Sequence, residues 1–362
     1  MYCKNCGKEI ADNSAFCPQC GKKVDGAPIK KEKGNGSNVK KHFRWGIAII
    51  AILTVVVIGV KVFPASKTSA SVEQIQTIAN NSQNGAVVAS DGTWIFYNDN
   101  GLCKMKLNDG TKQSVISRDI NPQDMFYIGG NLYYYSFPGY YKLDGSDGKD
   151  LGFSVFTENC IQSDGKMFYV TGSENYADGG VYAAKVGNTE KGTKLSDIHP
   201  TRLLLQGDYL YIISGFGSIN NETNENYGTW RIKTNGKDEM SIFEYCPDYL
   251  VFSGDKMYYT NEDKVVCSAN LDGSDESILA DIVVNGGLNV SDEYIFFINN
   301  ETQTIYRMNK DGGELRELNN EQSASLNVVG DWIFYKNWDA DYETYKMSFD
   351  GSYNQPVYAE QK

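Results

Sequence analysis

The chain has 362 residues, a formal net charge of −12 and a hydrophobic fraction of 41%, which is enough apolar material for a large buried core. Only two histidines occur, so catalytic or metal sites built from several histidines are excluded. The charge is unevenly divided: residues 1–44 hold ten Lys or Arg against four Asp or Glu, whereas residues 45–362 hold 24 against 42. Such a division favours a chain that occupies two compartments.

The first 23 residues carry two Cys-x-x-Cys-Gly sequences. Such a turn directs two sulfur atoms at one point, and its glycine allows the positive φ that closes the turn. Four thiolates predict a closed tetrahedral zinc site with a structural role, and iron is the chemical alternative. A segment this short has almost no core, so we expect it to fold only with its metal. The predicted ligands are Cys3, Cys6, Cys17 and Cys20.

With all four cysteines and both following glycines present, residues 1–23 resemble the short zinc-ribbon domains found at the N-termini of many bacterial membrane proteins. Residues 24–44 then form a flexible, basic linker. Its lysines lack interleaved aromatic residues, so nucleic-acid binding is not expected.

The segment Trp45–Phe63 is apolar except for Lys61 near its end. At about 1.5 Å per residue, a helix of this length reaches roughly 28 Å, which matches a hydrocarbon core of about 30 Å. We therefore predict one transmembrane helix. A buried core helix or a cleaved signal peptide fits less well, because a polar linker and a cysteine motif come first.

Basic residues gather just before this apolar segment, at Lys40, Lys41 and Arg44. The positive-inside rule then places the N-terminus in the cytoplasm and the acidic remainder outside, on a Gram-positive-type cell membrane. For residues 64–85 we predict a polar stalk with a short helix around Val72–Ala79. Such a stalk would hold the following domain off the membrane without fixing its orientation.

Residues 86–362 repeat one pattern of an aromatic-rich strand, a second strand and an Asp-Gly-type turn. A period of about 40 residues built from short strands predicts radially stacked four-stranded units, which is a β-propeller. The fold class is therefore mainly β, with seven blades as the economical count and six as the alternative. The aromatic strand cores begin at Thr93, Leu132, Met167, Tyr209, Met257, Tyr294 and Trp332.

These repeats resemble the YWTD β-propeller of low-density-lipoprotein-receptor-type proteins and a related bacterial domain family of unknown function. The nearest match is the sequence KVVCSANLDGS, which begins at Lys264. The Thr-Asp pair of the motif is mostly missing here, and YWTD propellers have six blades. The resemblance implies the fold and supplies no site residues.

Strand order divides the connections of a blade, with strands A to D in chain order, between two faces. The A–B and C–D turns on one face are short, as at Asp272–Gly273, whereas the B–C and D–A connections on the other face vary. The longest varied loop runs from Gly215 to Gly228. Variable loops on a regular scaffold are typical binding sites. The candidate ligand-binding residues on this face are His199, Tyr227, Trp230, Asp339 and Asp341.

No catalytic motif appears, since the sequences HExxH, GxSxG and GxxxxGK[ST] are absent. The carboxylates of Asp339, Asp341 and Glu343 could hold calcium, but they lack the glycine and downstream glutamate of a dedicated loop. We interpret them as surface charge. The cysteines of the repeats are expected to be buried in strands, with a Cys246–Cys267 disulfide as the alternative. They are Cys103, Cys160, Cys246 and Cys267.

The sequence is therefore interpreted as a single-pass membrane protein with a cytoplasmic structural zinc ribbon and an extracytoplasmic β-propeller. The propeller is expected to bind or sense an envelope glycan or a partner protein. Two alternatives stay open: a propeller enzyme that uses carboxylates on its variable face, and a passive scaffold in a membrane complex.

Overall fold

A computed structural model describes residues 72–357, with gaps at 109–113, 137–138, 146, 151–159, 164, 172–178, 186–191 and 216–225. All of them belong to the unit Phe63–Lys362, one of two into which the chain divides. The predicted zinc ribbon, linker and transmembrane helix lie outside the described residues. Within residues 72–357, apart from the gaps, no helix has the length and apolar character needed to cross a membrane.

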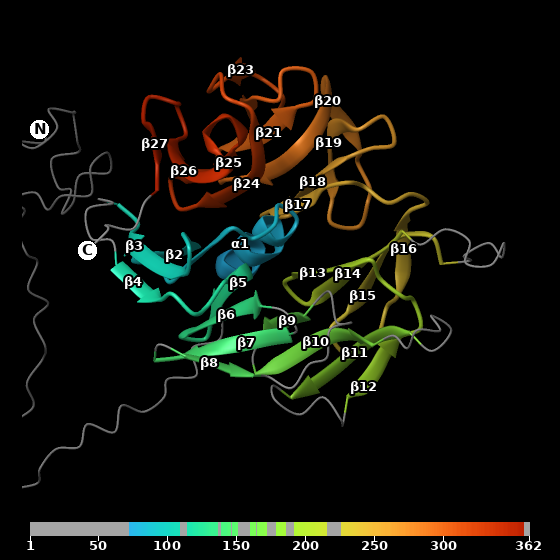
Figure 1. The fold of residues 1–362 in the computed structure, drawn as a ribbon. Coiled ribbons are helices and arrows are strands. Elements are labelled where there is room, and N and C mark those ends of the chain that lie inside the picture. Colours follow the sequence, from blue (N-terminus) through green and yellow to red (C-terminus); the bar gives the residue numbers. More distant parts are fainter. Residues whose placement is uncertain are drawn as a thin grey trace, which may run out of the picture. The chain divides into compact units, whose positions relative to one another are not determined.

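Five antiparallel sheets have four strands each, and consecutive strands are neighbours in every one (Figure 1). The first contains β1 (Val88–Ser90), β2 (Trp94–Asn98), β3 (Leu102–Lys106) and β4 (Ser114–Ser117). The second contains β5 (Gln123–Ile128), β6 (Asn131–Ser136), β7 (Gly139–Asp144) and β8 (Asp147–Asp150). The third contains β9 (Cys160–Ser163), β10 (Lys166–Thr171), β11 (Gly180–Lys185) and β12 (Thr193–Ser196). The fourth contains β13 (Arg202–Gln206), β14 (Tyr209–Ser214), β15 (Gly228–Lys233) and β16 (Met240–Phe243), and the last contains β24 (Ser323–Val329), β25 (Trp332–Asn337), β26 (Glu343–Ser348) and β27 (Asn354–Pro356).

The remaining sheet has seven strands in the order β17 to β23. They are β17 (Leu250–Ser253), β18 (Lys256–Thr260), β19 (Val265–Asn270), β20 (Ser277–Val290), β21 (Tyr294–Asn299), β22 (Ile305–Asn309) and β23 (Arg316–Glu317). The first half of β20 pairs with β19, as at Ser277 with Ser268, and the second half pairs with β21, as at Val290 with Ile295.

The predicted count of seven separate blades, and its alternative of six, are wrong. Five four-stranded blades stand apart, and strands β17 to β23 form one sheet that is joined through β20. The cause is local. No turn sequence interrupts Ser277–Val290 until Gly286 and Gly287, where the register shifts but the strand continues. A glycine bulge bends a strand without ending it. The predicted β-propeller architecture itself is confirmed.

The core lies between neighbouring layers of strands, which explains why the middle of most strands is apolar on both sides. One cluster joins Val251 and Tyr258 of β17 and β18 to Leu288 and Phe297 of β20 and β21, all at most 4% exposed. The two halves of the seven-stranded sheet therefore pack against each other. The aromatic-rich strand cores supply most of the large buried side chains, as stacked layers require.

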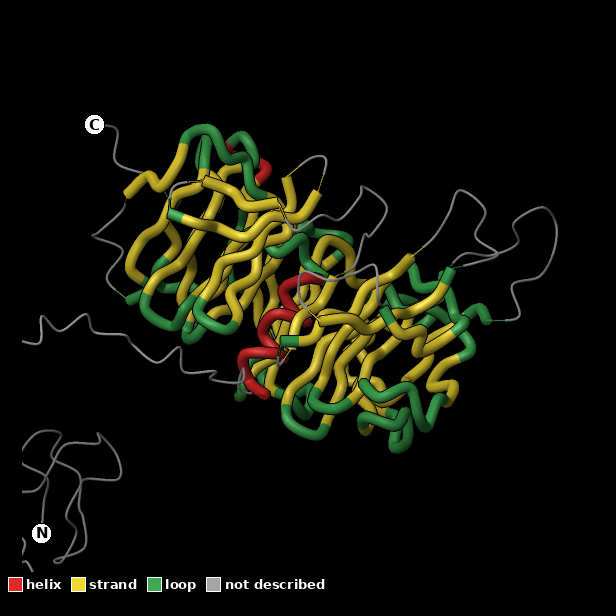
Figure 2. Tube along the Cα trace, turned by 90° about the horizontal axis from the view of Figure 1, so that it is seen from below, coloured by secondary structure: helices red, strands yellow, loops and turns green. Residues whose placement is uncertain are grey.

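Helix α1 (Val72–Ser82) lies at the centre of the ring of sheets (Figure 1). Figure 2 shows the same helix running between the strands of opposite sides. Ile75 packs with β13 and β14, and Ala79 packs with β17 and its neighbours. Ile75 and Ala79, at positions i and i+4, thus form an apolar side of the helix that faces these inner strands.

Three asparagines fasten α1 and the turn after it to the innermost strands. The side-chain amide of Asn80 donates to the carbonyl of Phe252 at 2.8 Å and accepts from its N–H at 2.7 Å. Asn81 makes the same pair of bonds with Val328, at 3.1 and 2.9 Å. Asn84 does so with Leu288, at 2.9 and 3.1 Å. An innermost strand has one unpaired edge, and each amide satisfies a donor and an acceptor on that edge.

The direction of α1 follows from contacts near its two ends. Gln74 donates to the carbonyl of Tyr127 and Gln76 to that of Gly254, both beside A–B turns. At the other end, Gln83 accepts a bond from Arg202 at the start of β13. The helix therefore begins on the face of the A–B turns, here called the turn face, and ends toward the variable face of the B–C and D–A connections.

This position differs from the expected polar stalk. A short helix was predicted at Val72–Ala79, and a helix is found at Val72–Ser82. Residues 72–85, however, pack inside the propeller, because Asn80, Asn81 and Asn84 have partners there, and so their orientation is fixed. The rest of the predicted stalk lies outside the described residues.

Candidate functional site

The five predicted ligand-binding residues lie on or near the variable face, but in two places. His199 is in the connection from β12 to β13, while Tyr227 and Trp230 stand at the start of β15. Asp339 and Asp341 belong to the loop between β25 and β26. Most of the Gly215–Gly228 loop, predicted as the main contributor, lies outside the described residues.

At the first place, one side chain is exposed and the other two are not. His199 is half-buried, and its ring covers Gly179 so closely that a Cβ atom there would lie 2.0 Å from Cδ2. Trp230 is half-buried too, and its indole N–H donates to the carbonyl of Asn226 at 3.1 Å. Tyr227 is 45% exposed. We therefore assign His199 and Trp230 mainly to packing and keep Tyr227 as a surface residue.

Tyr227 lies beside the thiol of Cys246. A charge on that thiol, followed by burial, raises the pKa of the Tyr227 hydroxyl. The Cys246 thiol itself donates to the carbonyls of Ser214 and Gly228, at 3.2 and 3.5 Å. Burial raises its pKa, so it is kept as a neutral thiol.

At the second place, a short 3-10 helix, Trp338–Ala340, is held rigidly. The buried side chain of Asn337 accepts a bond from the Asp339 N–H at 2.9 Å and caps this helix. The Asp339 carboxylate accepts from the Gln322 N–H at 2.9 Å, and the Trp338 N–H donates to the Gln322 carbonyl at 2.8 Å. Asp339 therefore fixes the loop to the neighbouring connection and is not a free ligand-binding group.

This loop presents two exposed aromatic rings, here called the aromatic pair, Trp338 and Tyr342. Trp338 is 58% exposed and Tyr342 41%, and their ring centroids lie 4.6 Å apart at 59°. Asp341 and Tyr342 both have positive φ, at 51° and 63°, which costs energy in residues other than glycine. Such strain is kept where the surrounding structure holds it in place, and it often marks a functional site.

Sequence reasoning missed the aromatic pair. In this loop it chose Asp339 and Asp341 as its candidates. The available signal was two aromatic residues spaced four apart in an otherwise acidic, polar loop. Large apolar side chains that stay exposed are more informative than exposed carboxylates, which are common on every surface.

The structure also bears on the calcium alternative and on the cysteines of the repeats. The described part of the chain contains no group of three or more His, Cys, Asp or Glu side chains placed to hold a metal ion, so the calcium reading gains no support. Cys103, Cys246 and Cys267 are free thiols, and the alternative of a Cys246–Cys267 disulfide is wrong. Burial raises the pKa of Cys267 to about 11, which makes it unreactive. The side chain of Cys160 lies outside the described residues.

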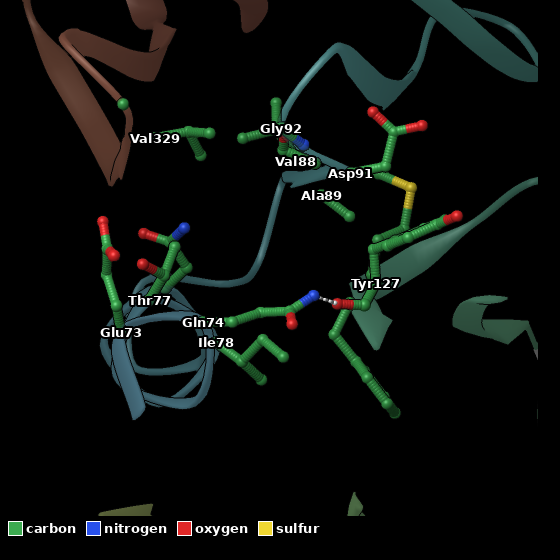
Figure 3. Close-up of a pocket in the computed structure, with 15 residues that line it drawn as sticks. Glu73, Gln74, Thr77, Ile78, Val88, Ala89, Asp91, Gly92, Tyr127 and Val329 are labelled. Carbon is green, nitrogen blue, oxygen red and sulfur yellow. Dashed lines mark hydrogen bonds between the residues drawn. The ribbon is translucent and has the colours of Figure 1, made fainter. Parts of the chain in front are cut away.

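A cavity of about 280 Å³ lies beside α1, close to the turn face (Figure 3). Its walls come from the first half of α1, from β1 with its following turn, from β5 and from the end of β24. Its lining includes Glu73, Ile78, Asp91, Met125, Tyr127 and Val329. This cavity could not be predicted from the sequence, because it exists only once α1 lies inside the ring of sheets.

Comparison with protein families supports the N-terminal motif. Residues 2–24 match a family model described as a zinc-ribbon domain. The match includes Cys3, Cys6, Cys17 and Cys20, and it confirms the predicted ribbon at the level of the family; the bound metal stays a prediction. Among curated protein sequences, none matches this chain.

Solved structures resemble the propeller in fold. A prolyl endopeptidase structure aligns with a TM-score of 0.54 and 12% identity, over 79% of this chain and 51% of that one. PorZ, a surface component of the type-IX secretion system of Porphyromonas gingivalis, aligns with a TM-score of 0.52 and 12% identity, over 77% of this chain and 38% of that one. A chain from a nidogen/laminin complex gives a TM-score of 0.43 and 13% identity, over 62% of this chain and 91% of that one.

The chain spans about half or less of the first two structures, and at these identities the similarity concerns the fold alone. The particular resemblance to YWTD propellers is not confirmed by it. The chain combines a zinc-ribbon domain at its N-terminus with a β-propeller.

Proposed function

We propose that this chain is a single-pass membrane protein whose extracytoplasmic propeller binds an envelope glycan through the aromatic pair on its variable face. The observation that carries the proposal is the rigid exposure of Trp338 and Tyr342, which are 58% and 41% exposed although both rings are large. In this proposal the cytoplasmic ribbon holds structural zinc through its four cysteines.

The aromatic pair suits a flat ligand that carries both apolar and polar groups. Trp338 and Tyr342 offer ring surface, and the Tyr342 hydroxyl lies 3.4 Å from the Ser325 hydroxyl at the edge of the pair. The Nζ atom of Lys336 lies 5.6 Å from the centroid of the Tyr342 ring. Sugars have this mixture of C–H faces and hydroxyl groups, and aromatic residues with polar neighbours are common in such contact surfaces.

The preorganised loop favours binding further. Because bonds from Asn337, Asp339 and Trp338 already fix the backbone, the ligand need not order it. Saving that entropy strengthens binding without any additional contact.

The position of α1 is consistent with this arrangement. The helix starts at the turn face, since Gln76 contacts the A–B turn at Gly254. The helix therefore enters the propeller at the turn face. The aromatic pair, on the opposite face, is left uncovered by it.

The test uses intact cells that produce the full chain and labelled peptidoglycan fragments and wall polysaccharides as probes. We expect surface binding by the parent chain, weakened at least about tenfold by the double substitution Trp338→Ala and Tyr342→Ala. The matched control is Tyr353→Ala, because Tyr353 is 45% exposed in the same blade but lies on the turn face.

The outcomes separate the two parts of the proposal. Equal binding by the parent and the Trp338/Tyr342 variant would rule out the aromatic pair as the site. Binding that appears only after the cells are permeabilised would contradict the external location and leave the site intact. If no glycan probe binds the parent chain in either condition, the glycan proposal fails.

A further inference from the structure

The channel of the propeller is only partly filled by α1. Ile75 and Ala79 face β13 and β17 and are 7% and 3% exposed. Thr77, on the opposite side of the helix, and Ile78, farther around it, are only half-buried and line the cavity of about 280 Å³. The helix thus lies against one side of the channel, and the cavity is the space left on the side of β1, β5 and β24.

The walls of this cavity combine aliphatic and neutral polar side chains with two acidic ones. Figure 3 shows Glu73 on one side and Asp91 on the other, with Ile78, Val88 and Val329 between them. The lining contains no Lys, Arg or His. A site with negative groups on two sides, aliphatic side chains along part of its walls and no positive charge of its own complements a cation at each end of a short carbon chain.

The hydrogen bonds of the lining show which polar groups are still able to bind. Asp91 uses Oδ1 to accept from the N–H groups of Thr93 and Trp94, at 2.8 and 2.6 Å, which leaves its second oxygen. Asn81, by contrast, has its amide oxygen fully used, because that oxygen accepts from the Val328 N–H and from Asn289. Among the charged groups of the lining, the carboxylates are the acceptors that fit ammonium groups.

The field of Asp91 reaches the interior of the cavity. Burial raises the pKa of the Tyr127 hydroxyl, and the negative charge of Asp91 raises it further. Tyr127 also supplies the carbonyl that fixes Gln74 of α1, at 2.9 Å (Figure 3). One wall residue, Tyr127, is thus bonded to the helix and lies within the field of Asp91.

We propose that this cavity binds a short aliphatic diamine, with one ammonium group at Glu73, the other at Asp91 and the carbon chain along Ile78, Val88 and Val329. The proposal is independent of the glycan site, because the aromatic pair lies on the opposite, variable face. It assigns a second ligand site to the turn-face side of the propeller, beside the start of α1.

The experiment titrates the full chain, in detergent and at low ionic strength, with 1,4-diaminobutane, and measures binding by calorimetry. We expect saturable binding by the parent chain. Butylamine, with one charge, is expected to bind more weakly, and 1-butanol, with none, not measurably. Raising the salt concentration is expected to weaken the binding, because exposed charges are screened.

Three isosteric variants locate the site. Glu73→Gln and Asp91→Asn are each expected to weaken diamine binding about two- to fivefold, as for exposed ion pairs. Asp91→Asn keeps the oxygen that accepts from Thr93 and Trp94, so the turn should persist. The control is Asp255→Asn, which removes an exposed carboxylate from an equivalent A–B turn next to β17, away from the cavity.

Absence of diamine binding by the parent chain would overturn the proposal. So would binding that Glu73→Gln and Asp91→Asn leave unchanged, or that Asp255→Asn weakens equally, since general attraction to an acidic protein would then explain it. Equal binding of 1-butanol would show an apolar site without charge recognition and would also overturn the proposal.

Discussion

The centre of the ring and the loop after β25 both depart from the usual distribution of side chains, in opposite ways. Around α1, amide groups are buried: Asn80, Asn81 and Asn84 are 4–5% exposed. At the aromatic pair, large rings are exposed instead. Every polar group of the first set has a partner in the chain, whereas the rings of the second lack cover. Buried polar groups with complete pairing therefore stabilise the architecture, whereas uncovered apolar surface on a fixed loop is the basis of the proposed binding site.

The largest effect is expected from Asn84→Ala. Removal of this amide leaves the N–H and C=O groups of Leu288 buried without a partner, which should lower the free energy of unfolding by about 3 kcal/mol. Urea unfolding of the full chain, followed by tryptophan fluorescence, measures the change.

The matched control for Asn84→Ala is Gln76→Ala in the same helix. Gln76 is only half-buried and its bond to the Gly254 carbonyl is long, at 3.4 Å, so a loss of about 0.5 kcal/mol or less is expected. A similar cost for both substitutions would break the comparison, because burial and pairing would then not distinguish the two amides.

An intermediate effect is expected from Asn337→Ala. Asn337 is a buried amide like those around α1, but it lies at the loop of the aromatic pair. This buried side chain caps the 3-10 helix that carries Trp338, and loss of a cap costs about 1 kcal/mol. Because the loop would then be less fixed, glycan binding should weaken as well. Unfolding measurements and binding assays on the same variant test both effects; weaker stability with unaltered binding would separate loop rigidity from recognition.

The smallest effect on stability is expected from the double substitution Trp338→Ala and Tyr342→Ala. Exposed rings contribute little to the core, so the free energy of unfolding should change by about 0.5 kcal/mol or less. Thermal unfolding of this variant, measured beside that of the parent chain, tests the expectation. A large loss of stability would show that the pair serves the fold, and it would remove the main support for a binding role.

The sequence predicted the features that local rules determine. Short strands with Asp-Gly turns predicted a propeller, and the glycines of the A–B turns adopt positive φ as expected, at 58° for Gly254 and 55° for Gly330. The polar, helix-compatible stretch after Ser71 predicted a helix close to its observed bounds. Each of these depends on residues that are neighbours in the chain.

The features that depend on distant residues were not predictable in the same way. The three asparagines looked like solvated stalk residues, because their partners, such as Phe252, lie some 170 positions away. The continuity of β20 depends on Gly287, where an added Cβ would lie 2.7 Å from Leu326 of the next layer. In the loop after β25, charge drew attention to Asp339, while the exposure of Trp338 becomes visible only in three dimensions.

The threading of α1 also determines how the propeller responds to mechanical load. A pull on the N-terminal segment reaches α1 before it reaches β1. From the helix and its following turn, the side-chain bonds of Asn80, Asn81 and Asn84 divide the load among β17, β24 and β20. A force applied at the hub and shared by several sheets must break these bonds together, whereas a force on an edge strand would peel one blade away. Since resistance to pulling depends on the unfolding barrier, this attachment is expected to make the propeller slow to unfold under a force applied at Val72.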